Sequence, residues 1–175
     1  MTNDEDVARA AGIPAAIAYA IRVVESGGKT HPHAVRFEPR LWNAHKDHEQ
    51  LPYTPPKGTR EQTDRGALDH AMQLDAATAV VCASFGARQV MGAHLLAITG
   101  KPPVEAVAAF DADPDGLSTP LFIHWIRANR RFVEEANKPE PDFEKLAVYY
   151  NGKVSYAEPL VQAAQMYEAK WPEVG

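Results

Sequence analysis

The chain has a single cysteine, Cys82, so no disulfide bond can form within it. Cys82 lies in the apolar run TAVVCASF, where a free cysteine usually behaves as a small buried hydrophobic residue. No stretch approaches the roughly 20 apolar residues that a membrane-spanning helix needs, so we expect no membrane insertion. The acidic N-terminus MTNDEDVARAAG lacks the basic segment and apolar core of a secretory signal.

Net charge is also small. The formal value of −5 does not favour nonspecific binding to nucleic acid or to an anionic membrane. Internal repeats and low-complexity tracts are missing too. With 175 residues and 45% hydrophobic content, the chain suits one globular domain over residues 1–175 with a core of its own.

Helical patterns account for most of the sequence. Asn3 is suited to cap a short first helix, and Gly12 to stop it. Residues 13–24 carry isoleucine and valine at spacings of three and four, which predicts a helix with a buried stripe, ended by Gly27 and Gly28. Further helices are predicted from Asp69 through HAMQLDAATAVVCASFG, within RQVMGAHLLAITG, and over PPVEAVAAF, TPLFIHWIRANRRFVEEAN, PDFEKLAVYYNG and YAEPLVQAAQMYEAKW, with DADPDG as a turn.

Residues 29–66 break the helical pattern. They hold four of the seven histidines, five prolines and the turn-rich segment LPYTPPKGTR, and AVRFE within them is compatible with a short strand. A connection of this length is more often functional than a plain link. The predicted class is therefore mainly α, with a long irregular insertion and a short β element.

The helix over residues 13–24 leads directly into Glu25, which is unexpected for stability. The C-terminal end of a helix dipole is negative and favours a cation there. Glu25 is therefore either an ordinary exposed end residue or a carboxyl group kept in place for chemistry. An apolar wall and the helix end both disfavour the charged form, so both would raise the pKa of such a carboxyl group and suit a general acid.

Three short motifs occur in order along the chain: Glu25-Ser26, then GARQVMG (Gly86–Gly92), then YYNG (Tyr149–Gly152). Together they resemble the lysozyme-like superfamily that includes goose-type lysozymes and soluble lytic transglycosylases. That resemblance implies that the helix-terminal glutamate is the acid and that the other two motifs line the glycan cleft.

The closer resemblance is to the N-acetylmuramidase domain of phage endolysins, over about Asp6 to Trp171. Its motifs correspond here to VES, FEPR (Phe37–Arg40), SFGARQVMG (Ser84–Gly92) and YYNG. Arg40 stands where that family usually has histidine, so no proton transfer is inferred at this position. Phe85 stands where the family has tryptophan, which is a milder change than that at Arg40.

The resemblance implies an enzyme that cleaves the β-1,4 bond between N-acetylmuramic acid and N-acetylglucosamine in bacterial peptidoglycan. Glu25 would be the catalytic acid. The substrate-binding residues would be Ser84, Gln89, Met91, Tyr150 and Asn151. Four of these have a plainer alternative: local capping or loop support for Gln89 and Asn151, packing of the cleft for Met91, and a core aromatic for Tyr150.

A second carboxylate is not assigned by the sequence. Glu38 matches the family's glutamate, but pairing with Arg36 or Arg40 to support the cleft wall is an equal alternative. Retaining and inverting glycosidases differ in the separation of their two carboxyl groups, and the resemblance also allows a mechanism with one essential glutamate.

Two other clusters of polar residues are read as solvated. The histidines of HPH and HKDHE lack the helical spacing of a zinc protease, so no metal site and no cofactor are predicted. RANRR (Arg127–Arg131) reads as the solvated face of a helix, with contact to peptidoglycan carboxylates as the alternative.

The expected partner is peptidoglycan, bound by a monomer, with no nucleic-acid partner. Without a signal peptide, a phage endolysin would collect in the host cytoplasm until released, and a virion-associated lysozyme would travel with the particle. Two alternatives remain open: a lytic transglycosylase that forms a 1,6-anhydro product, and a non-catalytic peptidoglycan-binding module.

Overall fold

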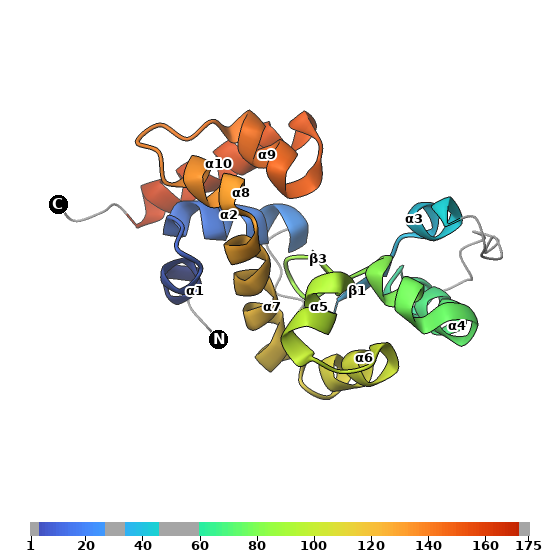
Figure 1. Cartoon of the computed structure of the whole chain (residues 1–175). Helices are drawn as coiled ribbons and strands as arrows, with labels where there is room; N and C mark the ends of the chain where they lie inside the picture. The colour runs from blue at the N-terminus through green and yellow to red at the C-terminus, as the bar shows by residue number, and fades with distance from the viewer. Residues whose placement is uncertain (1–3, 27–33, 46–59, 172–175) are drawn as a thin grey trace. The chain divides into compact units, whose positions relative to one another are not determined.

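The structure, a computed structural model, describes residues 4–26, 34–45 and 60–171. These form helices and one small sheet (Figure 1). The prediction of a mainly α fold with a short β element is confirmed. In chain order the elements are α1 (Asp4–Ala11), α2 (Ala15–Ser26), β1 (Val35–Phe37), α3 (Pro39–Ala44), α4 (Arg60–Val81), β2 (Ala83–Phe85), β3 (Val90–Met91), α5 (Gly92–Thr99), α6 (Pro103–Ala112), α7 (Pro114–Ala128), α8 (Arg130–Ala136), α9 (Phe143–Asn151), the 3₁₀ turn η1 (Val154–Tyr156) and α10 (Ala157–Lys170).

The chain divides into two compact units. The first unit comprises residues 1–30 and 122–175, and the second unit comprises residues 31–121. Helix α7 contributes its first half to the second unit and its second half to the first. The single domain predicted over residues 1–175 stays a prediction.

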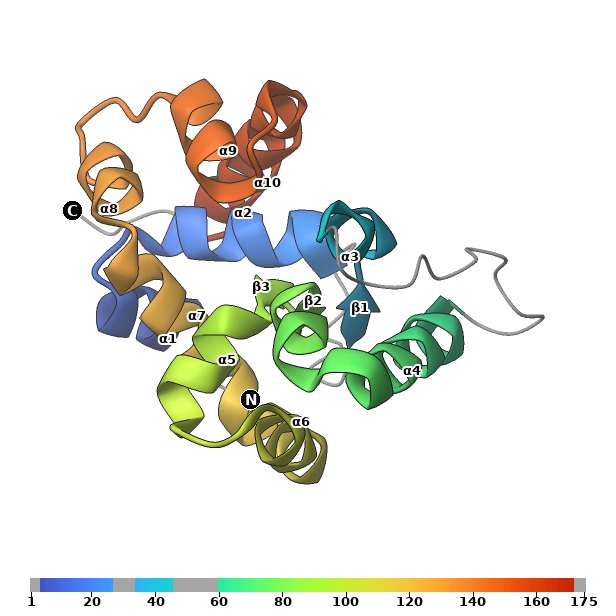
Figure 2. The ribbon, with the colours of Figure 1, turned by 45° about the vertical axis from the view of Figure 1, so that its right-hand side comes forward.

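The first unit is organised around α2, which packs along α10 (Figures 1 and 2). Ile13, Ile17 and Ile21 are buried, as their spacing predicts, and Val24 is half-buried. Helix α1 packs on α2 and ends at Ala11, just before Gly12, whose φ of 77° is the left-handed conformation that glycine adopts readily. The predicted cap Asn3 and stop residues Gly27 and Gly28 lie outside the described residues.

The second unit contains a three-stranded antiparallel sheet in the order β1-β2-β3, against which α4 and α5 pack (Figure 2). Val35 pairs with Phe85 across β1 and β2, and Ser84 pairs with Met91 across β2 and β3. Trp42, Phe37, Phe85 and Phe110 are among its largest fully buried side chains. Cys82 is buried as predicted, and that burial raises the pKa of its thiol, which makes the reactive thiolate scarcer.

The predicted irregular insertion over residues 29–66 is wrong in part. The short strand expected within AVRFE is confirmed as β1, but the structure also has the short helix α3 there, and α4 starts at Arg60 rather than at Asp69. Helix α3 begins with Pro39, whose fixed φ suits the first helical position. Most of LPYTPPKGTR lies outside the described residues.

The predicted helix from Asp69 through CASFG is wrong at its end. Helix α4 stops at Val81, and Ala83–Phe85 form the central strand β2. All three residues of β2 are buried, so the strand lacks the alternation of exposed and buried positions that would distinguish it from a buried helix segment. Helix α4 also changes direction at Asp75, whose carboxylate accepts the Thr78 N–H at 3.1 Å and caps the second segment.

Two predicted boundaries on the C-terminal side also need correction. DADPDG is a helix start rather than only a turn, because α7 begins at Pro114 and the Asp113 carboxylate accepts the Gly116 N–H at 2.9 Å. The long helix predicted over residues 119–137 is broken at Asn129. The Asn129 side chain accepts the Phe132 N–H at 3.2 Å and so caps a new helix, α8.

Among the described helices, none is by itself long and apolar enough to span a bilayer. Helices α1 and α2 together reach that length and composition, but they meet at a bend of 114°.

Candidate active site

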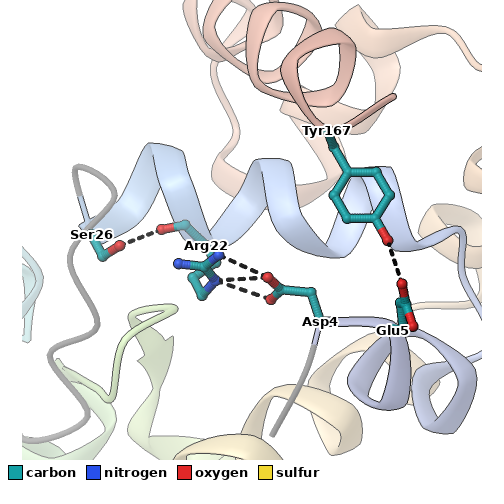
Figure 3. Close-up of polar contacts among 5 residues, drawn as sticks. All are labelled: Asp4, Glu5, Arg22, Ser26 and Tyr167. Carbon is teal, nitrogen blue, oxygen red and sulfur yellow. Dashed lines mark hydrogen bonds and ion pairs between the residues drawn. The ribbon is translucent and has the colours of Figure 1, made fainter. Parts of the chain in front are cut away.

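Glu25 lies in the last turn of α2, as predicted from the sequence, and its side chain is half-buried. The next residue, Ser26, donates a hydrogen bond of 2.6 Å from its hydroxyl to the Arg22 carbonyl oxygen (Figure 3). The bond runs back one turn along the helix, from the serine hydroxyl to the carbonyl group four residues earlier. The serine of the Glu25-Ser26 pair therefore fixes the turn that carries the glutamate.

The same end of α2 is tied to α1 by a charged pair. Arg22 donates two hydrogen bonds from Nε and one from a terminal nitrogen to the Asp4 carboxylate, at 2.8 to 3.1 Å (Figure 3). The two side chains are only 18% and 12% exposed, and the hydrogen-bonded Asp4 raises the pKa of Arg22. A bidentate pair of this kind fixes orientation as well as distance. It holds α2 one turn before Glu25.

A cluster of aromatic rings holds the other half of α2 against α10. Tyr19 lies 5.3 Å from Tyr167 and 5.9 Å from Trp171, measured between ring centroids. Tyr167 also donates a hydrogen bond of 3.3 Å to Glu5 of α1 (Figure 3). Helix α2 is thus supported by its neighbours along most of its length, which fixes the position of the turn that carries Glu25.

The YYNG motif forms the C-terminal end of α9, where Gly152 adopts a left-handed φ of 75°. Tyr150 packs edge-on against Trp125 at 4.9 Å and lies 6.4 Å from Phe132. Asn129 donates from its amide to the Tyr149 carbonyl oxygen at 3.2 Å. Tyr150 therefore has the core contacts of its plainer alternative, and Asn129 is a support for the motif that the sequence did not single out.

The start of α9 is fixed by an ionic network around Glu135, a carboxylate only 4% exposed. Glu135 accepts hydrogen bonds from the Lys138 ammonium at 2.8 Å and from the Asp142 N–H at 3.1 Å. Asp142 in turn accepts the N–H groups of Glu144 and Lys145, which makes it the N-cap of α9. The network fixes the first turn of α9, the helix whose C-terminal end carries YYNG.

Replacing Glu135 by glutamine should lower the unfolding midpoint by a few degrees at neutral pH and leave a smaller difference in acid. The hydrogen bond from Lys138, followed by that from Asp142, holds the pKa of Glu135 below its ordinary value of 4.5. A carboxylate with a lowered folded-state pKa stabilises the fold above the unfolded-state pKa, and that contribution is lost as the pH falls through the folded-state value. Thermal unfolding of both proteins between pH 3 and 7 measures this. A midpoint difference that is constant with pH would contradict it.

The GARQVMG motif forms the β2–β3 hairpin of the second unit, together with Ser84. The Ser84 hydroxyl donates to the Gln89 side-chain oxygen at 3.1 Å, and the Gln89 amide nitrogen donates to the Gly86 carbonyl oxygen at 3.0 Å. Gln89 has a φ of 47°, the one positive value at a non-glycine residue among the described residues. Both polar ends of its side chain thus support the hairpin, which is the loop-support role that the sequence left open. Met91, paired with Ser84, is half-buried.

Glu38 lies between β1 and α3. It forms an ion pair of 2.8 Å with Arg36, and its side chain is 31% exposed. Its backbone also joins β1 to the end of α4, because the Glu38 N–H donates to the Cys82 carbonyl oxygen at 2.9 Å. Pairing with Arg36 is the structural alternative predicted for Glu38. The other predicted partner, Arg40, is exposed. A role as second carboxylate stays a prediction.

RANRR has mainly structural contacts. Arg127 donates to the Ala10 carbonyl oxygen at the end of α1, at 2.6 and 3.0 Å, and Arg130 pairs with Glu134 on its own helix. As for metals, no group of three or more His, Cys, Asp or Glu side chains among the described residues could hold an ion. His31, His33 and His48 lie outside the described part of the chain.

The comparisons with known proteins identify the family and the fold of the chain. The family model described as N-acetylmuramidase matches residues 14–168. This chain belongs to the N-acetylmuramidase family. The matched range runs from the start of α2 nearly to the end of α10, so it includes Glu25, the hairpin and YYNG, and members of the family cleave peptidoglycan.

The fold is shared with a solved structure, "Crystal structure of Burkholderia AP3 phage endolysin". The two are 22% identical with a TM-score of 0.68, over 96% of this chain and 70% of that chain. At this identity the likeness establishes the fold. No curated protein sequence matches this muramidase-family chain.

The predicted site residues are divided between the two units. Ser84, Gln89 and Met91 share one hairpin of the second unit. Glu25 and the Tyr150–Asn151 pair belong to the first unit. That all of them line one glycan cleft stays a prediction. The supports that the sequence did not reveal are Asp4 on α1, Asn129 before α8 and Glu135 on α8. A fourth is Ser118 on α7, whose hydroxyl oxygen accepts the Ala87 N–H of the hairpin turn.

Proposed function

We propose that the chain cleaves the β-1,4 bond between N-acetylmuramic acid and N-acetylglucosamine, with Glu25 as the general acid. The observation that carries this proposal is the N-acetylmuramidase match over residues 14–168, which begins with the helix that ends at Glu25 and Ser26. The half-buried position of Glu25 supports it, because a general acid has to keep its proton near neutral pH.

In the proposed reaction, Glu25 transfers its proton to the glycosidic oxygen as the bond from that oxygen to the muramic acid anomeric carbon breaks. The anomeric carbon gains oxocarbenium-like character, and a water molecule adds to it. The water supplies the hydroxyl group of the new reducing end, and its remaining proton restores the acid form of Glu25 if the same group accepts it. Each turnover therefore consumes one water and leaves the enzyme unchanged.

The glycan contacts are proposed for five residues: Ser84, Gln89, Met91, Tyr150 and Asn151. Hydroxyl and amide groups suit sugar hydroxyls and N-acetyl groups, and an aromatic ring suits the apolar face of a sugar. For Gln89 the hairpin bonds define the direction in which the amide points. Its contribution to binding would then come from a group already held in place.

Two other outcomes of the same site are retained as alternatives. If the substrate's own hydroxyl attacks the anomeric carbon instead of water, the product is a 1,6-anhydro sugar and the enzyme is a lytic transglycosylase. The substitution of Arg40 for the family's usual histidine leaves a non-catalytic binding module as the second alternative.

Digestion of purified peptidoglycan should release fragments that end in reducing N-acetylmuramic acid, measured by mass spectrometry before and after borohydride reduction. Hydrolysis adds one water across the cleaved bond, so these fragments are heavier by one water than the anhydro products and gain two hydrogens on reduction. Anhydro fragments that resist reduction would establish the transglycosylase. Binding to the wall material without any released fragment would establish the module.

We further propose that the protein acts as a phage endolysin or a virion-associated lysozyme. The structure that it resembles is titled a phage endolysin, which supports this setting. In the endolysin role it would collect in the host cytoplasm and reach the wall after release, acting there as a monomer. Fractionation of host cells before and after lysis separates the two roles, since a virion-associated enzyme would sediment with the particles.

A further inference from the structure

The turn of the β2–β3 hairpin has an unusual backbone. Gly86 has a φ of 77° and Gln89 a φ of 47°, so two of its four residues adopt the left-handed conformation. Glycine does so at no steric cost, whereas a residue with a side chain persists there only when its surroundings hold it. The contacts that hold this turn therefore also fix the position of the Gln89 side chain.

Two hydrogen bonds hold the turn from outside the hairpin. The Gly86 N–H donates to the Ala34 carbonyl oxygen at 2.8 Å, next to β1. The Ala87 N–H donates to the hydroxyl oxygen of Ser118, on α7, at 3.2 Å. Ala87 is 8% and Ser118 is 6% exposed, so this amide depends on the serine rather than on water for an acceptor.

The shape of the turn is matched to the same serine. A Cβ atom added at Gly86 would lie 2.5 Å from the Ser118 hydroxyl oxygen and 3.1 Å from its Cβ. Helix α7 thus meets the turn at the residue that has no side chain. Ser118 supplies both a hydrogen-bond acceptor and the surface that excludes any larger residue at Gly86.

Gln89 is hydrogen-bonded directly to Gly86, so the position of Gly86 determines that of Gln89. The Gly86 carbonyl oxygen accepts the Gln89 backbone N–H at 3.1 Å and the Gln89 side-chain amide at 3.0 Å. A shift of the turn away from α7 would move this shared acceptor. Both the left-handed backbone of Gln89 and the direction of its amide would then change.

We propose that Ser118 is a positioning residue for glycan binding, acting through Ala87 and Gly86 on Gln89. This inference rests on the proposed function, in which the Gln89 side chain contacts the glycan. Ser118 itself touches no substrate in this mechanism. Its hydroxyl group is buried beneath the turn and holds a backbone amide.

A double-mutant cycle separates this role from plain support of the fold. Ser118→Ala, Gln89→Ala and the double variant are compared with the parent in kcat and KM on soluble glycan strands, well below each unfolding midpoint. Ser118→Ala should raise KM roughly five- to tenfold, the effect of losing about one hydrogen bond, with kcat changed less than about twofold. In the Gln89→Ala background the same substitution should change KM less than about twofold, because its route to the substrate is already absent.

Thr99→Ala is the matched control, since the Thr99 hydroxyl is half-buried in the same unit but donates to Leu95 of its own helix at 2.8 Å and accepts the exposed Lys101 N–H at 3.4 Å, just after that helix. It should leave KM unchanged. If Ser118→Ala does not fold, Ser118→Cys enters the same cycle, because a thiol keeps an atom in place but is a much weaker acceptor.

An equal rise in KM in both backgrounds, or none in either, overturns the positioning role of Ser118. The muropeptides released by the parent protein are measured as well, so that failure of this inference can be distinguished from failure of the proposed function. If the parent releases muropeptides and the cycle shows no coupling, the Ser118 inference alone fails. If the parent releases none, the proposed function fails and the inference falls with it.

Discussion

Replacing Glu25 by glutamine is expected to lower the lytic rate by about 10² to 10⁴, the usual contribution of general-acid catalysis, while leaving the fold intact. Glutamine has nearly the same shape and keeps the ability to form hydrogen bonds, so the packing of the last turn of α2 should change little. It cannot deliver a proton to the leaving oxygen. Because the substitution removes a carboxyl group from the negative end of a helix, the unfolding midpoint should stay level or rise slightly.

Activity and thermal unfolding should be measured on the same preparation of this variant, beside Glu168→Gln as a control. Glu168 is an exposed glutamate on α10, and its replacement should change neither quantity. A Glu25→Gln protein that lyses permeabilised cells at more than about a tenth of the parent rate would show that Glu25 is not the acid. A joint collapse of activity and unfolding midpoint would show instead that Glu25 is a structural residue.

Glu38→Gln in the same series tests the open question of a second carboxylate. The ion pair with Arg36 is partly open to solvent, so its loss should cost at most about 1 kcal/mol of stability. A fall in rate as large as that of Glu25→Gln, without a change in the unfolding midpoint, would assign Glu38 to the chemistry. A small fall would leave it as support for the strand and helix it joins.

The helices were predictable where a periodic apolar stripe reports a buried face. Ile17 and Ile21 show this for α2, because residues three or four apart on a helix share one side. Strand β2 was not predictable in the same way. It has three residues, all buried, so it shows no alternation of buried and exposed positions, and only pairing with β1 and β3 distinguishes it from the end of the helix before it. DADPDG did contain its own signal, an aspartate followed by proline, which is the pattern of a capped helix start.

The candidate site was predictable only as far as local motifs reach. Glu25 at a helix end and the order of the three motifs could be read directly from the sequence. The partners that hold them could not, because Ser118 is 31 residues from Ala87 and Asn129 is 20 residues from Tyr149. Such pairs depend on which helix packs beside which turn. The sequence also did not explain the second glycine of GARQVMG, Gly92. In the structure Gly92 lies too close to the backbone of α4 for any side chain to fit.

Replacing Gly92, the last residue of that motif, by alanine should destabilise the protein by about 3 kcal/mol or more, at the high end for overpacking. Gly92 is buried at the start of α5, where an added Cβ would overlap the Val80 carbonyl oxygen of α4 and lie 2.9 Å from the Phe85 ring. A carbonyl group in the last turns of a helix cannot move aside as a flexible side chain can. The helices would have to separate, and for a chain of this size the unfolding midpoint should fall by roughly 10 °C.

Gly66→Ala is the matched control because it makes the same chemical change within α4, where nothing lies within 4 Å of the added Cβ. There alanine should stabilise the protein by about 0.5 to 1 kcal/mol, since it restricts the unfolded chain and favours the helix. Thermal unfolding of the two variants should therefore move in opposite directions from the parent. The activity lost by Gly92→Ala should follow its stability and return on cooling, unlike the loss expected for Glu25→Gln. A Gly92→Ala protein as stable as the parent would mean that α5 can move away from α4, and that the glycine is not needed for their close approach.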